Sequence, residues 1–103
     1  EDLGAVCYHV TNTDSSLHEL SLLRLGEPVD DEQAADLVGR LAANEPPTVE
    51  IEAVGGMGAV SPGFDGYLYL DLDPGSYLAV DFMPDPGDPR PHMLDGYYTR
   101  FTV

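Results

Sequence analysis

The stretch LDPGSYLAVDFM, residues 72–83, decides the fold that we expect for this chain. Its first six residues match the pattern Leu-x-Pro-Gly-x-Tyr of a tyrosine corner. In such a corner the hydroxyl of Tyr77 bonds to the backbone a few residues upstream and fixes a Greek-key crossover between strands. Residues 76–83 then read as a short strand bounded by turn residues. The stretch predicts an all-β Greek-key sandwich and by itself carries no chemistry.

Other segments on both sides of this stretch have the pattern of short strands. Residues 4–10 alternate in polarity, which is the period of a half-buried strand. The apolar pattern resumes from Leu17 to Leu25, in a strand that carries His18 near its start. We expect about seven or eight strands in all. The later ones lie in TVEIEAV (48–54), GYLYLDL (66–72) and the terminal YYTRFTV (97–103), with a glycine-rich turn over 55–63.

One segment changes period and predicts a helix near 31–44. Asp30 is a suitable N-cap with Gln33 three residues later, and apolar residues recur at helical spacing within 37–41. Pro46 and Pro47 end the pattern, because proline cannot continue a helix. We expect this inserted helix to form the crossover between the two sheets.

Composition limits the classes of function. The chain has 103 residues, which is one domain over 1–103, and a formal net charge of −15 with only four basic residues. Such acidity repels nucleic acid and anionic membranes. No run of apolar residues is long enough for membrane insertion. A single cysteine cannot form an internal disulfide. The chain begins at Glu1 without an apolar signal segment, from which we expect a processed product.

NTDSSLHELSLLRL (12–25) and the terminal region 72–103, with its proline-rich loop and the dipeptide Pro-His, resemble the cupredoxins, the plastocyanin- and azurin-like copper proteins. In that family a His, a Cys, a second His and a Met bind copper. The resemblance puts His18 and His92 at the two histidine positions, Asp81 at the cysteine position and Tyr97 at the methionine position. It implies a secreted, periplasmic or cell-surface domain. The type 1 blue copper site is absent, because a carboxylate cannot replace the thiolate in electron transfer.

Two imidazoles and one carboxylate are a competent ligand set for divalent ions. The first hypothesis is therefore a metal site of His18, Asp81 and His92 that binds copper or zinc. The alternative is a metal-free structural or protein-interaction module, in which Asp81 accepts hydrogen bonds from a histidine or from Arg90. We expect Tyr97 to pack beside the site.

Neighbouring residues are assigned no role in the site. We expect His9 and Glu19 to be solvated and Met93 to be an exposed residue at the rim. Nothing in the sequence supplies a nucleophile elbow or a phosphate loop, so we expect no enzyme.

Overall fold

The computed structural model describes residues 5–85 and 87–103, which form six β-strands, one α-helix and one short 3₁₀ helix. The helix α1 spans Asp31–Ala42 and the 3₁₀ turn η1 spans His92–Asp95. The antiparallel strands and single α-helix confirm a mostly β protein, whereas the Greek-key topology stays a prediction. Six strands in these residues are fewer than we expected. The strands are β1 (Ala5–Thr11), β2 (His18–Leu25), β3 (Ile51–Val60), β4 (Asp65–Asp71), β5 (Ser76–Val80) and β6 (Tyr98–Thr102).

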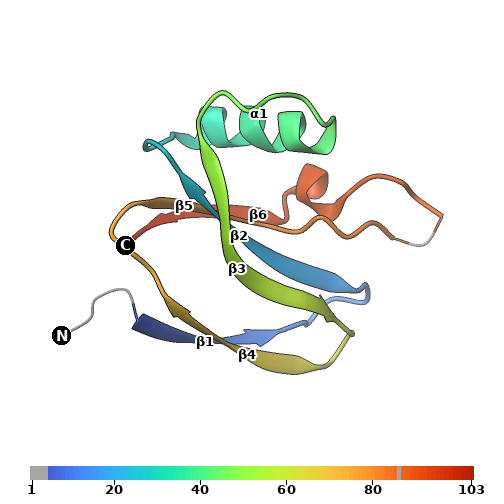
Figure 1. The fold of residues 1–103 in the computed structure, drawn as a ribbon. Coiled ribbons are helices and arrows are strands. Elements are labelled where there is room, and N and C mark those ends of the chain that lie inside the picture. The colour runs from blue at the N-terminus through green and yellow to red at the C-terminus, as the bar shows by residue number, and fades with distance from the viewer. Residues whose placement is uncertain (1–4, 86) are drawn as a thin grey trace.

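The strands form two antiparallel sheets. The smaller sheet pairs β1 with β4, and the larger has the order β3-β2-β5-β6. The chain passes from one sheet to the other after β1, after β3 and after β4. Figure 1 shows three layers, with α1 above the larger sheet and the β1–β4 sheet below it.

The larger sheet is covered on both faces. Nearly all residues of its inner strand β5 are therefore buried. One face packs against α1 in the main hydrophobic cluster, and Leu78 at its centre is fully buried. Burying a leucine side chain completely contributes roughly 1.5–3 kcal/mol. Tyr77 and Ala79 alternate with these residues and are buried on the opposite face. The cluster consists of Leu23, Leu25, Ala34, Leu37, Val38, Leu78, Val80 and Met93.

The helix forms where the sequence predicts it. The Asp30 carboxylate accepts a hydrogen bond from the Gln33 backbone N–H, and the Gln33 side chain accepts one from the Asp30 N–H, which completes a capping box. Its predicted role as a crossover between sheets is wrong. The helix connects β2 to β3, which are neighbours in the same sheet. The apolar face of α1 is instead used to cover that sheet.

The tyrosine corner is present. The hydroxyl of Tyr77 donates to the carbonyl of Asp73 at 2.5 Å, and the ring is 1% exposed and stacks on Phe101. This bond ties the β4–β5 crossover to the start of β5, and Asp81 directly follows the other end of that strand.

The glycine-rich segment is not the turn that we expected. Gly55, Gly56 and Gly58 lie inside β3, and the turn follows at residues 61–64, where the Phe64 N–H donates to the Ser61 carbonyl. A Cβ on Gly56 would collide with the carbonyl of Leu20, so glycine permits close approach of β3 to β2. The β2–β3 register shifts between His18 and Leu20, as in a β-bulge. This irregularity directly follows His18, the first residue of β2.

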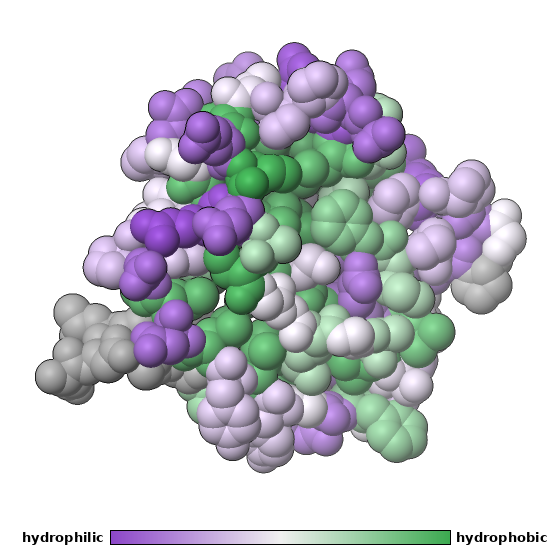
Figure 2. Space-filling model, viewed as in Figure 1, coloured by the Kyte–Doolittle hydropathy of each residue, from purple (hydrophilic) through white to green (hydrophobic). Residues whose placement is uncertain are grey.

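The visible surface differs in polarity between the helix and the strands. In Figure 2 hydrophilic residues predominate around α1, and hydrophobic residues come to the surface over β3. As the edge strand of the larger sheet, β3 leaves Val54, Met57 and Val60 half-buried.

Candidate metal centre

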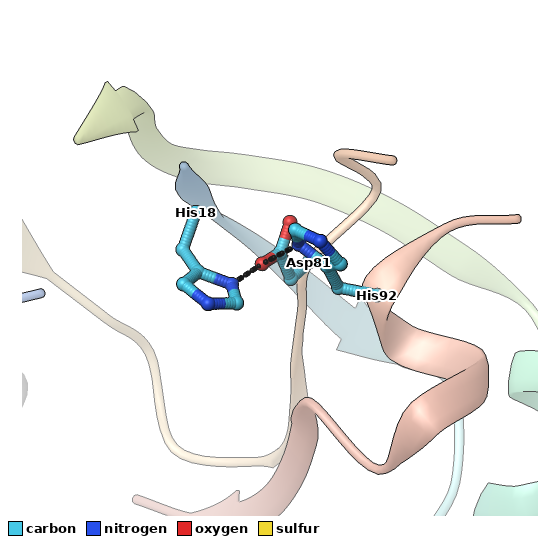
Figure 3. A group of neighbouring side chains, drawn as sticks. All are labelled: His18, Asp81 and His92. Carbon is cyan, nitrogen blue, oxygen red and sulfur yellow. Dashed lines mark hydrogen bonds and ion pairs between the residues drawn. The ribbon is translucent and has the colours of Figure 1, made fainter. Parts of the chain in front are cut away.

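His18, Asp81 and His92 come together at one end of the larger sheet (Figure 3). His18 is the first residue of β2, Asp81 directly follows β5, and His92 is the first residue of η1. The register that sets Ser21 opposite Val80 brings the start of β2 beside the end of β5. One ligand atom from each of the three residues lies within 4.8 Å of the others. A separation of 74 positions along the sequence is therefore no obstacle to contact, as the resemblance implied.

The loop between Asp81 and His92 closes on itself through backbone hydrogen bonds. The His92 N–H donates to the Met83 carbonyl at 2.8 Å, and the Met93 N–H donates to the Asp81 carbonyl at 2.8 Å. Pro84 and Pro91 form an isolated antiparallel bridge between these two ends. The imidazole of His92 is thereby held against the carboxylate of Asp81.

Met93 is not at the exposed rim as expected. It is 1% exposed and belongs to the hydrophobic cluster under α1. The short 3₁₀ turn directs His92 and Met93 to different surroundings, so Met93 anchors η1 in the core while His92 faces Asp81.

The carboxylate of Asp81 is the centre of the group. Its Oδ2 atom contacts Nδ1 of His18 and lies 3.1 Å from Nδ1 of His92. Its Oδ1 atom accepts from the backbone N–H of Met83 at 2.8 Å and of Glu19 at 3.4 Å. Asp81 and His92 are each 4% exposed. A buried carboxylate that is fully hydrogen-bonded in this way avoids the cost of an unpaired charge.

The outer nitrogen of each imidazole faces another carboxylate. Nε2 of His18 lies 2.7 Å from Oδ2 of Asp14, and Nε2 of His92 lies 2.9 Å from Oδ1 of Asp85. The sequence analysis did not single out Asp14 or Asp85. Each lies a few residues before its histidine, but that spacing is hard to notice in a chain with 19 acidic residues.

These contacts change the titration of the groups. Burial by itself lowers the pKa of His18, but hydrogen bonds to Asp14 and Asp81 outweigh it and leave that pKa above the usual 6.5. Burial also lowers the pKa of His92. Hydrogen bonds to Asp85 and Asp81 outweigh this effect and raise the pKa of His92 above the usual 6.5. The bond from His18 lowers the pKa of Asp14 to about 2, and the bond from His92 lowers the pKa of Asp85. Without metal, these pairings favour the imidazolium form of both histidines over the neutral form.

Tyr97 packs beside the site, as expected. Its ring centroid lies 4.5 Å from that of His18, and its hydroxyl donates to Oδ2 of Asp14 at 3.0 Å. The bond to Asp14 raises the pKa of the Tyr97 phenol, which opposes its use as a metal ligand. A cleft of about 250 Å³ opens beside His18, with Asp14 and Tyr97 in its lining.

Three residues that the sequence analysis considered as possible or excluded partners of the site have side-chain contacts outside the His18–Asp81–His92 group. Arg90 donates to Asp95 at 3.1 Å and is not the partner of Asp81. Glu19 is half-buried and accepts the N–H of Phe82 at 3.1 Å, which continues the β2–β5 pairing beyond the ladder. His9 is exposed on the smaller sheet, where it lies 2.5 Å from Asp65.

No family model, curated protein or solved structure matches this chain. The cupredoxin resemblance therefore remains a prediction. Among the described residues, no helix is both long and apolar enough to span a membrane. The observation that bears on function is the geometry of the site: His18, Asp81 and His92 form a group that could hold a metal ion.

Proposed function

We propose that this protein is a divalent metal-binding domain whose ligands are Nδ1 of His18, Nδ1 of His92 and the carboxylate of Asp81. One observation carries the proposal: two histidines from different elements direct the same ring nitrogen to one buried carboxylate oxygen. Imidazole nitrogen with carboxylate oxygen is a donor set for Zn(II) and Cu(II). Three protein ligands meeting in one place are enough for such an ion.

The donor set favours Cu(II) or Zn(II) over Cu(I). A carboxylate is a hard oxygen donor, whereas Cu(I) prefers thiolate and thioether sulfur. The chain has one cysteine, Cys7, and it lies in β1 of the other sheet. We therefore propose a cupredoxin-like extracytoplasmic domain without type 1 electron transfer. We propose a binding role and not catalysis, because the sequence supplies no nucleophile elbow or phosphate loop to act with the site.

Metal binding here competes with protons. Both Nδ1 atoms must give up the proton that they share with Asp81 before they can act as ligands. Because the pKa of each histidine is raised, apparent affinity rises with pH until both imidazoles are neutral. The cleft beside His18 offers an entry path.

A second candidate function is a metal-free structural or protein-interaction module on the same scaffold. The observation that favours it is the complete pairing of the site: all four imidazole nitrogens of His18 and His92 contact a carboxylate. Among the described residues, no buried side-chain nitrogen or oxygen lacks a hydrogen-bond partner. Such a network can rigidify the end of the sheet without an ion.

Calorimetric titration of chelator-treated protein with Zn(II) and with Cu(II) separates the two functions. We expect one ion per chain at micromolar affinity or tighter, lost in the His92→Ala variant. His9→Ala is the matched control, because His9 also pairs with an aspartate but lies in the smaller sheet. Metal at 100 times the dissociation constant should add about 2.7 kcal/mol to the free energy of unfolding. No heat and an unchanged unfolding midpoint would leave only the metal-free function.

A further inference from the structure

Asp14 and Asp85 contact the two histidines of the site in the same way, although they come from different loops. Each places a carboxylate oxygen on Nε2 of its histidine, on the side of the ring away from Asp81. Asp14 precedes β2 and Asp85 lies in the proline-rich loop before η1. Two independent loops thus make one arrangement: outer carboxylate, imidazole, central carboxylate.

The Asp14 loop is itself fixed by hydrogen bonds. The side chain of the buried Asn12 donates to the carbonyls of Ser16 at 2.8 Å and of Val60 at 2.7 Å, and it accepts the N–H of Asp14 at 3.0 Å. Oδ1 of Asp14 then accepts the N–H of Ser15 at 2.8 Å. Oδ2 is left to face His18, so its direction is set before any ligand binds.

A neutral imidazole carries one proton, and the partner of one nitrogen decides which nitrogen holds it. A carboxylate accepts and never donates when ionised, so an aspartate on Nε2 keeps the proton there. When a metal ion displaces the proton that Nδ1 shares with Asp81, the proton on Nε2 stays in place, so the lone pair of Nδ1 faces the ion in a fixed ring orientation.

We infer that Asp14 and Asp85 are positioning residues for the metal centre, which hold the Nε2–H tautomer of His18 and His92 and so present both Nδ1 atoms to the ion. This inference rests on the proposed function. It also defines the class of ion further, since two outer carboxylates add negative charge around a ligand set that already contains Asp81. A divalent cation is favoured over a monovalent one.

The two aspartates differ in a way that makes the inference testable. In Asp14→Asn, the amide oxygen keeps the bond from the Ser15 N–H, so the amide N–H₂ faces Nε2 of His18 and the Tyr97 hydroxyl, which can turn to accept. The substitution therefore favours the opposite tautomer of His18. In Asp85→Asn, the amide oxygen can still accept from Nε2 of His92, because the Ser16 hydroxyl, which also bonds to Asp85, can either donate or accept. Asp88→Asn is the matched control: it removes the same charge from the same loop, and its oxygen still accepts the Arg90 N–H.

The experiment measures zinc affinity by competition with a chelator in the full chain and its three variants. Removing an outer partner of a metal-binding histidine typically costs 10–100-fold in affinity, so we expect Asp14→Asn to lose roughly that much. Asp85→Asn should lose less than about 10-fold, and Asp88→Asn should change affinity by less than about 2-fold. In parallel, ¹⁵N spectra of the zinc-loaded wild type should show zinc on Nδ1 and a proton on Nε2 of both rings.

The outcomes distinguish this inference from the proposed function. Equal losses in all three variants, or zinc on Nε2 in the wild type, would overturn the positioning role while metal binding stands. A wild type that takes up neither Zn(II) in this experiment nor Cu(II) in the calorimetric titration would refute the proposed function and the positioning role together. Greater loss in Asp14→Asn than in Asp85→Asn, with a Nδ1-bound wild type, supports the inference, since charge removal alone affects both equally.

Discussion

Replacing Asp81 by asparagine should destabilise the metal-free protein strongly in mild acid and only slightly in mild base. The amide oxygen of the variant takes over the bonds from the N–H groups of Met83 and Glu19, because those donors face Oδ1. The amide N–H₂ then occupies the position of Oδ2, between the Nδ1 atoms of His18 and His92. At about pH 5.5 both imidazoles are protonated, so donors face donors.

The magnitude follows from the contacts that are lost. Each hydrogen bond to a charged group contributes about 1.5–3 kcal/mol, and breaking a buried ion pair costs about 3–5 kcal/mol. We therefore expect a loss of about 3 kcal/mol at about pH 5.5, which lowers the melting temperature of a domain of this size by on the order of 15 °C. At about pH 8.5 the neutral imidazoles can accept from the amide, and the loss should shrink to about 1 kcal/mol.

The direction of the pH effect follows from the raised pKa of both histidines. A raised folded-state pKa contributes stability that is complete below the unfolded value near 6.5 and disappears as pH rises through the folded-state value. The assay is urea denaturation at both pH values with chelator present. The control is Asp65→Asn beside the exposed His9, which should cost less than about 1 kcal/mol. An equal loss at both pH values, or a more stable variant in acid, would refute the reasoning.

Three further predictions concern the scaffold and the site together. The metal-free wild type should be most stable between about pH 4 and pH 6.5. Asp14 and Asp85, whose pKa values are lowered, lose their contribution to stability in acid, and His18 and His92, whose pKa values are raised, lose theirs in base. Calorimetric melting at a series of pH values tests this, and a melting temperature that does not depend on pH would contradict it. Tyr77→Phe removes the bond to the Asp73 carbonyl and should cost about 1 kcal/mol in urea denaturation without changing zinc affinity, so a large change in affinity would speak against a purely structural corner. Gly56→Ala forces a methyl group against the Leu20 carbonyl beside the bulge and should lower both the melting temperature and zinc affinity, whereas Gly58→Ala, with open space around it, should leave zinc affinity unchanged.

The features predicted correctly from sequence depend on neighbouring residues. The capping box of α1 lies within one turn, and the tyrosine corner joins Tyr77 to a carbonyl four residues earlier. Both motifs are satisfied by local hydrogen bonds, so their residues suffice to predict them.

The features that the sequence analysis missed depend on distant parts of the chain. Gly55 and Gly56 resemble a turn locally, yet they continue β3 because β2 lies alongside and needs space at Leu20. Met93 is buried because α1 covers that face of the sheet, which no pattern around Met93 reveals. Packing between remote elements overrides local preference at such positions.

For the site, the sequence by itself determined the chemistry of the donors: two imidazoles and a carboxylate, without a thiolate beside them. Only the tertiary structure decided which ring nitrogens face Asp81 and which aspartates, Asp14 and Asp85, lie behind the rings. The reason is physical. Ligand type is a property of each side chain, whereas a shared hydrogen-bond geometry exists only after β2, β5 and η1 have packed together.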